Sequence, residues 1–110
     1  MTGMRVSLLV GSFALAAAAH GADLAAGQAK AKEICQACHG LDGNSTVADY
    51  PKLGGQYPDY LAKALRDYKS GERDFPTMRA IAAPLTDDEM QKLANYYASA
   101  AALSAQAEKK

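Results

Sequence analysis

The stretch CQACH, residues 35–39, decides how the rest of the chain is interpreted. Cys35 and Cys38 are the only two cysteines among the 110 residues. Two cysteines this close together indicate a disulfide, a metal site or the attachment point of a cofactor. A zinc site needs more Cys or His ligands than the chain offers, because the second histidine, His20, falls in a segment with the pattern of a cleavable leader.

The residue after the second cysteine narrows this choice. His39 completes the pattern C-x-x-C-H, which is typical of covalent attachment of a c-type haem. Two intervening residues let both thiols reach one porphyrin edge as thioethers, and the adjacent imidazole then reaches the iron. We therefore predict one haem c at Cys35 and Cys38, with His39 as the proximal ligand. A structural disulfide and a thioredoxin-type redox pair are the alternatives, although the latter expects a βαβ context that the sequence lacks.

The N-terminal segment has the pattern of a secretion signal. Arg5 provides a basic start, and residues 6–19 (VSLLVGSFALAAAA) form an apolar run that is short for a membrane span. We predict a signal peptide over residues 1–22, a cytochrome c domain over residues 23–110, and a periplasmic location. An uncleaved N-terminal anchor is the alternative. Cleavage fits after any of three small residues: Ala19, Gly21 or Ala22.

The composition favours one small folded domain and excludes some partners. Hydrophobic residues make up 49% of the chain and charged residues 22%, as in an ordinary folded soluble domain. The chain carries 12 basic and 12 acidic side chains, so its formal charge is balanced. This balance argues against a nucleic-acid binder and against an acidic tail. After removal of the signal we expect no stable membrane insertion.

Apolar residues recur at helical spacing in three segments, and no segment alternates as a strand does. The first helix is expected from about Asp23, its N-cap, to the cysteines. The second is expected from Pro58, which suits the first turn of a helix. The third begins with a capping box, in which Thr86 is the N-cap and Glu89 lies three residues on, and it runs to about Ala102.

Two long stretches between these helices, residues 40–57 and residues 72–85, have no regular pattern. Structureless stretches of this length are uncommon in a compact domain and require a reason. A large apolar cofactor that both stretches wrap would supply the core that so small a chain lacks. The sequence therefore predicts an all-α fold of three main helices with long loops around one covalently bound haem.

The motifs of the chain, taken in order, resemble those of class I c-type cytochromes, in particular their small monohaem bacterial periplasmic branch. The resemblance covers residues 23–102 and implies the class I cytochrome c fold. Where the first and last helices cross, it implies a contact between Gly27 and Tyr96. Beside CQACH, it rests on motifs that are weak singly and persuasive in order: Gly27-x3-Ala31-x3-Cys35, His39-Gly40-x2-Gly43, PKLGGQ (51–56), Tyr60-Leu61-x3-Leu65, Gly71-Glu72-Arg73, Met78, LTDDE (85–89) and Leu93-x2-Tyr96-Tyr97.

The resemblance also implies roles for residues outside the CQACH motif. Met78 stands where the family places its thioether, the sixth iron ligand, whereas Met90 occupies a core position beside the capping box. Pro51 stands where a proline carbonyl accepts the Nδ1–H of His39. Arg73 is a candidate partner for a haem propionate, because a guanidinium matches a carboxylate. A packed loop methionine, a turn proline and a solvated arginine are the structural alternatives.

These residues predict an electron carrier rather than an enzyme. With both axial positions filled by protein ligands, the iron has no open site for a substrate and changes only its oxidation state. The expected partners are redox proteins, such as a terminal oxidase, that dock transiently. Two alternatives are a fixed haem subunit of a larger dehydrogenase or oxidase, and a haem enzyme with an open iron site if Met78 does not bind it.

Overall fold

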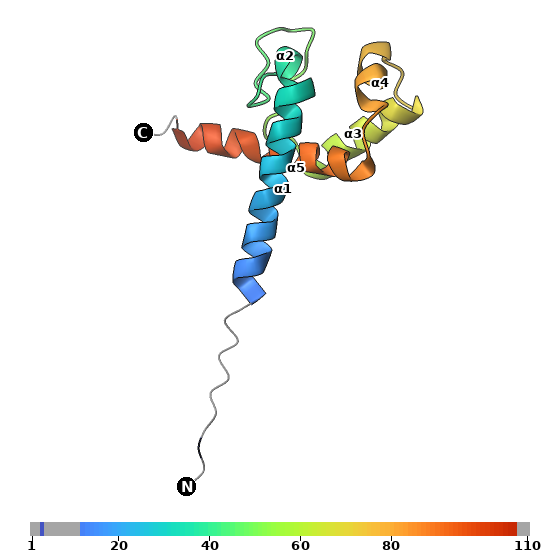
Figure 1. Ribbon diagram of the computed structural model, residues 1–110. Helices are drawn as coiled ribbons and strands as arrows, with labels where there is room; N and C mark the ends of the chain where they lie inside the picture. Colours follow the sequence, from blue (N-terminus) through green and yellow to red (C-terminus); the bar gives the residue numbers. More distant parts are fainter. Residues whose placement is uncertain (1–2, 4–11, 108–110) are drawn as a thin grey trace.

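The computed structural model describes residue 3 and residues 12–107, with side-chain surroundings for residues 3 and 20–100. Within these ranges the predicted all-α fold is confirmed, because they contain helices and no strand. Figure 1 shows α1 as the long vertical helix, α5 lying across it, and α3 and α4 together on one side. The helices are α1 (Ser12–Ile34), α2 (Gln36–His39), α3 (Pro58–Ser70), α4 (Pro76–Ala82) and α5 (Asp87–Ala107).

The start of α1 differs from the prediction. The helix begins at Ser12, so Asp23 lies inside it in the full chain and is not its N-cap. All three predicted cleavage positions fall within α1, whereas Arg5 and residues 6–11 lie outside the described residues. None of the helices in the described part of the chain combines the length and apolarity needed to cross a membrane.

The crossing of α1 and α5 depends on a glycine. A Cβ atom on Gly27 would lie 2.3 Å from the carbonyl oxygen of Lys92 and 2.9 Å from the Cβ atom of Tyr96. Because such distances are too short for real Cβ atoms, any other residue at position 27 would push the two helices apart. The predicted contact between Gly27 and Tyr96 is therefore present.

The core lies where α1, α3 and α5 meet. Met90 and Leu93 are its largest fully buried side chains, each 1% exposed, so the core position predicted for Met90 is confirmed. Burying side chains of this size stabilises a small domain by about 1.5–3 kcal/mol each. The other buried members come from the same three helices and the turn before α5: Ala31, Leu61, Ala62, Leu85, Ala94, Tyr96, Tyr97 and Ala100.

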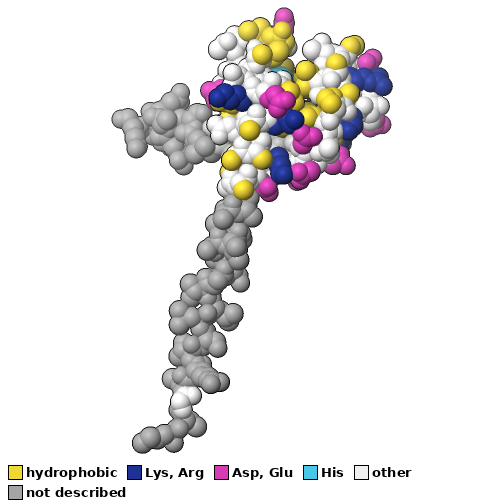
Figure 2. Space-filling model, viewed as in Figure 1, with side chains coloured by type: hydrophobic (Ala, Val, Ile, Leu, Met, Phe, Trp, Pro, Cys, Tyr) yellow, Lys and Arg dark blue, Asp and Glu magenta, His cyan; other side chains and the backbone are white. Residues whose placement is uncertain are grey.

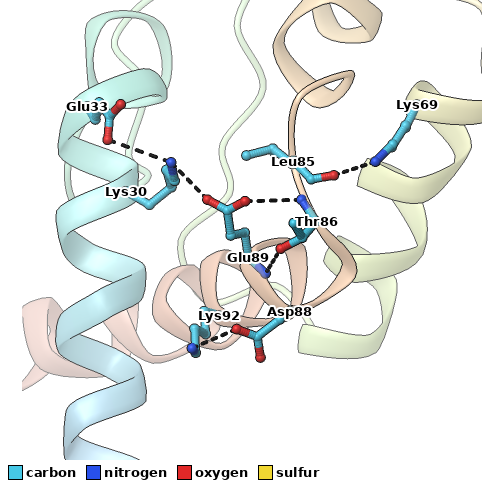
Figure 3. Close-up of polar contacts among 8 residues, drawn as sticks. All are labelled: Lys30, Glu33, Lys69, Leu85, Thr86, Asp88, Glu89 and Lys92. Atoms are coloured by element: carbon cyan, nitrogen blue, oxygen red, sulfur yellow. Dashed lines mark hydrogen bonds and ion pairs between the residues drawn. The ribbon is translucent and has the colours of Figure 1, made fainter.

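The N-terminus of α5 is held by the predicted capping box and by an ion pair. The Thr86 hydroxyl accepts a hydrogen bond from the Glu89 backbone N–H, and the Glu89 carboxylate accepts one from the Thr86 N–H, both at 3.1 Å. The second carboxylate oxygen of Glu89 lies 2.8 Å from the ammonium of Lys30 on α1 (Figure 3). One carboxylate thus caps α5 and ties it to α1. The helix then continues to Ala107, beyond the expected end at Ala102.

The stretch 72–85 is not wholly irregular, and the prediction that Met78 lies in a loop is wrong. The short helix α4 forms within this stretch, with Pro76 in its first turn as Pro58 is in the first turn of α3. After α4 the chain returns to the core at Leu85, whose carbonyl accepts a hydrogen bond from Lys69 of α3 (Figure 3). Residues 40–57, by contrast, contain no helix or strand, as predicted.

Candidate cofactor site

A cavity of about 400 Å³ lies between the helices, and its lining includes every site residue that the sequence predicted. Its volume falls in the range of ligand and cofactor sites. Figure 2 shows hydrophobic side chains gathered at the top of the molecule and in the hollow beside α4, with charges of both signs around them. The predicted residues on its lining are Cys35, Cys38, His39, Pro51, Arg73 and Met78.

The two cysteines lie at the junction of α1 and α2. The carbonyl of Cys35 accepts hydrogen bonds from the N–H groups of Cys38 and His39, so one tight turn carries all three side chains. Both thiols are free. Burial raises the pKa of the Cys35 thiol to about 11, which keeps it neutral near pH 7. Since the thiolate is the reactive form, this environment does not suit a thioredoxin-type redox pair.

His39 is buried, with 7% of its surface exposed. Its Nδ1 atom lies 2.8 Å from the carbonyl oxygen of Pro51. Because a carbonyl oxygen can only accept a hydrogen bond, Nδ1 carries the ring proton and Nε2 keeps its lone pair. The contact expected between Pro51 and His39 is therefore present, and it leaves Nε2 as the atom that could bind a metal ion.

The loop that carries Pro51 is closed at its base. The Gly43 carbonyl accepts hydrogen bonds from the N–H groups of Leu53, at 2.8 Å, and Gly54, at 3.1 Å. Gly43 has a φ of 75°, and a Cβ atom there would lie 2.4 Å from the nitrogen of Gly54. Only glycine fits this conformation and this close approach. Residues 44–53 therefore form a loop with a fixed base.

Met78 and Arg73 reach the cavity from the segment that follows α3. Met78 is partly buried on α4 and lines the same cavity as His39. The guanidinium of Arg73 lies 4.8 Å from the centroid of the Tyr68 ring, in a cation–π contact. In Figure 1, α2 and α4 both lie in the upper part of the molecule, and the cavity draws its lining from each.

The sequence also matches known proteins. Residues 22–96 match the family described as cytochrome C oxidase, cbb3-type, subunit III. The chain is a class I c-type cytochrome. A cytochrome c4 of Thiocapsa roseopersicina is 50% identical over 84 residues, which are 76% of this chain and 43% of that protein. Cytochrome c4 of Pseudomonas aeruginosa is 45% identical over 100 residues, covering 90% of this chain and 49% of its own length.

A shorter relative matches along nearly its whole length. Cytochrome c-554(548) of Halomonas halodenitrificans is 38% identical over 80 residues, which are 70% of this chain and 95% of that protein. By contrast, the chain spans about half the length of the cytochrome c4 relatives, between 43% and 51%. The relatives agree with the sequence prediction of a cytochrome rather than an enzyme.

The cofactor of this cytochrome is haem c, and its residues fit that group. Two free thiols one helical turn apart, a buried imidazole with a free Nε2 lone pair, and a thioether all border one apolar cavity. Thiols can form thioethers with the vinyl groups, and imidazole and thioether are the usual axial pair of electron-transferring haem. A disulfide would not require the apolar space or the oriented histidine.

Sequence reasoning missed one residue of this site. From the sequence, Tyr97 has no role beyond its place in the Leu93-x2-Tyr96-Tyr97 motif, yet it lines the cavity and its hydroxyl donates a hydrogen bond to the Gly40 carbonyl at 3.0 Å. It is 2% exposed, and burial raises its pKa above the ordinary tyrosine value. A buried tyrosine hydroxyl needs a hydrogen-bond partner, which is the only hint that the sequence offers of this role. The sequence does not show which group that partner is.

Proposed function

We propose that this cytochrome is a monohaem electron carrier that works in the periplasm after removal of residues 1–22. The observation that carries the proposal is that both thiols, His39 and Met78 border the same apolar cavity. In the proposed site, Cys35 and Cys38 hold the haem covalently, and His39 and Met78 bind its iron. Haem in such a site supplies an iron that gains and loses one electron without exchanging ligands.

The residues around the proposed ligands support this function. The hydrogen bond from His39 to Pro51 fixes the plane of the imidazole and raises the basicity of Nε2. Leu61, Leu85 and Leu93 line the cavity and are buried, so they would exclude water from an iron bound there. Arg73 at the cavity edge is suited to pair with a propionate, because a guanidinium offers two parallel donors to a carboxylate.

The rim of the cavity supports transient docking of redox proteins. Tyr50, Tyr60 and Phe75 line the cavity and are 40%, 51% and 50% exposed. Exposed aromatic side chains at the mouth of a cofactor site favour contact with a partner. Lys52, Arg73 and Asp49 lie in the same lining, so charges of both signs border the cavity. Such a surface suits small, weak interfaces that release the partner after transfer.

A second candidate function is a fixed haem subunit of a larger complex. The matching family carries the description of an oxidase subunit. A protein of Chlorobaculum tepidum described as the cytochrome subunit of sulfide dehydrogenase is 38% identical over 63 residues. Purification from the native membrane and periplasmic fractions separates the two functions. A carrier purifies as a free haem protein, whereas a subunit purifies in fixed ratio with a dehydrogenase or oxidase.

Absorption spectra of the holoprotein in both oxidation states test the proposed ligands. We expect low-spin iron and, in the ferric protein, the weak near-infrared band of a sulfur–iron bond. Met78→Leu should abolish this band and lower the reduction potential, because a thioether ligand favours Fe(II). Met90→Leu is the matched control, since it removes a buried core thioether and nearly conserves volume. Loss of the band in Met90→Leu, or its survival in Met78→Leu, would contradict the assignment.

The mass of the purified protein tests the covalent attachment and the export together. We expect the mass of a chain processed near residue 22 plus one haem, with no haem extracted by acidic acetone. Extractable haem would exclude thioether bonds to Cys35 and Cys38. A chain that keeps residues 1–22 would instead favour the membrane-anchored alternative.

A further inference from the structure

Tyr97 contacts both ends of the loop that carries Pro51. Its hydroxyl donates a hydrogen bond to the carbonyl of Gly40, the first residue after the histidine, at 3.0 Å. Its backbone carbonyl accepts a hydrogen bond from the N–H of Gly55, near the other end of the loop, also at 3.0 Å. Tyr97 of α5 therefore binds both the segment that leads into the loop and the segment that leads out of it.

The ring of Tyr97 also supports the base of the loop. A Cβ atom on Gly43 would lie 2.8 Å from Cδ1 of Tyr97, so the ring packs directly on the backbone at Gly43. Gly43 in turn accepts the hydrogen bonds that close the loop from Leu53 and Gly54. Because Tyr97 is 2% exposed and set in the core of α5, it gives the loop a rigid support.

We propose that Tyr97 is a positioning residue for the axial histidine: it fixes the base of the 40–57 loop and so keeps the Pro51 carbonyl on Nδ1 of His39. This inference rests on the proposed function, because it concerns the ligand that His39 provides. The loop brings Pro51 to within 2.8 Å of His39. Hydrogen bonds weaken steeply with misalignment, so a shift at the base of the loop weakens this bond.

Tyr96 offers a matched control on the same helix. Its hydroxyl donates a hydrogen bond to the carbonyl of Leu41, one residue beyond the carbonyl that Tyr97 uses. Tyr96 packs on α1 at Gly27 and is not among the residues that line the cavity. Tyr96→Phe and Tyr97→Phe each remove one hydroxyl that binds a carbonyl at the start of the loop, and Tyr97→Phe also removes the hydrogen bond between that hydroxyl and the Cys35 side chain. Both variants keep the ring and the backbone, so they compare a hydroxyl bound to Gly40, the residue next to His39, with a hydroxyl bound to Leu41, one residue further on.

Exchange of the His39 Nδ1 proton with solvent, measured by NMR on the ferrous holoprotein, tests the proposal. In Tyr97→Phe we expect exchange about tenfold faster, because the unpaired Gly40 carbonyl favours opening of the loop. The reduction potential should rise, since a weaker hydrogen bond makes the imidazole a poorer donor to Fe(III). In Tyr96→Phe both quantities should stay near those of the native protein, even where the free energy of unfolding falls.

A second measurement uses the native protein alone. If Tyr97 holds the loop as one unit, the Gly55 amide proton and the His39 Nδ1 proton should show similar protection, because one opening exposes both. Equal changes in the two Tyr→Phe variants, no change in Tyr97→Phe, or a Gly55 amide that exchanges far faster than the His39 proton would each overturn the inference. The proposed function is judged separately, by the near-infrared band of the native ferric protein. If the native protein shows this band but the exchange results contradict the prediction, only the inference about Tyr97 is overturned.

Discussion

Gly27 shows how one residue can set the geometry of the whole cytochrome. It lies on α1 where the backbone of Lys92 and the side chain of Tyr96 come closest. Glycine costs about 1 kcal/mol in a helix interior relative to alanine. The chain accepts that cost because the missing Cβ lets the two helices make close contact where they cross.

Gly27→Ala should therefore destabilise the protein, although alanine is the better helix former. The new Cβ atom would lie 2.3 Å from a backbone oxygen that cannot move without α5. We expect a loss of about 1–3 kcal/mol in the free energy of unfolding, the usual cost of overpacking. Urea unfolding followed by circular dichroism measures it. Gln28→Ala, one residue along on the exposed side of α1, should change stability by no more than about 0.5 kcal/mol. Equal stability of Gly27→Ala and the native protein would show that the crossing is loosely packed.

At the scale of the helices, the N-terminus of α5 depends on one carboxylate with two roles. Glu89 accepts the Thr86 N–H in the capping box and pairs with Lys30 of α1. The hydrogen bond from Lys30, followed by those from Thr86, lowers the pKa of Glu89 from 4.5 to about 2. A carboxyl whose pKa is lower in the folded state contributes stability above its unfolded pKa and loses it as the pH falls toward the folded one.

Glu89→Gln should consequently destabilise the protein at neutral pH and not at low pH. Glutamine can still complete the capping box but cannot pair with Lys30. The difference in unfolding free energy between native and variant should be constant above about pH 4.5 and should shrink as the pH falls toward about 2. Glu33→Gln is the matched control, because Glu33 also pairs with Lys30, at 3.7 Å, but is 66% exposed and caps nothing. Its effect should be small at every pH. A difference that is independent of pH would contradict the role of the ion pair.

The helices also show which parts of the fold can be predicted from sequence. The starts of α3 and α5 were predicted because Pro58 and the Thr86–Glu89 box act through neighbouring residues. The helix α4 was not predicted, because seven residues are too few to establish a helical periodicity and Pro76 also suits a turn. The start of α1 differed from the prediction because the alanine-rich residues 12–22 have a high helix propensity and continue the helix back to Ser12.

The candidate site likewise contains residues that the sequence predicts and one that it does not. Cys35, Cys38 and His39 follow from five adjacent residues, and Met78 and Pro51 from their places in an ordered set of motifs. The link between Tyr97 and the loop spans 57 residues of sequence between the hydroxyl and the Gly40 carbonyl. Contacts over such separations depend on how the helices pack, which no local pattern specifies.

At the scale of the whole molecule, the cofactor is part of the core. The cavity of about 400 Å³ is bordered by side chains of α3, α4 and α5, including Leu61, Leu93 and Ile81. A domain of this size buries too little apolar surface of its own to be robustly stable. A group that binds only the folded chain adds its binding free energy to folding.

The double variant Cys35→Ala/Cys38→Ala should accordingly be largely unfolded. Both side chains line the cavity, and without thioethers the haem is held only by its axial ligands and apolar contacts. We expect far-ultraviolet circular dichroism to show a large loss of helix at 25 °C. Met78→Leu, which keeps both cysteines, is the control and should retain native helix content. A double variant with native helix content and no haem would show that the polypeptide folds by itself.

The crossing at Gly27 also has a consequence for timing. The crossing joins the first long helix of the chain to the last. The residues near position 27 therefore cannot pack until the residues near position 96 are present. A chain that becomes available from its N-terminus onward cannot complete this crossing until nearly all of it is present. During that interval the CQACH segment is not yet enclosed, and its thiols stay accessible to whatever attaches the haem. The order of the helices along the chain thus leaves the CQACH segment open to attachment of the cofactor until α5 has packed on α1.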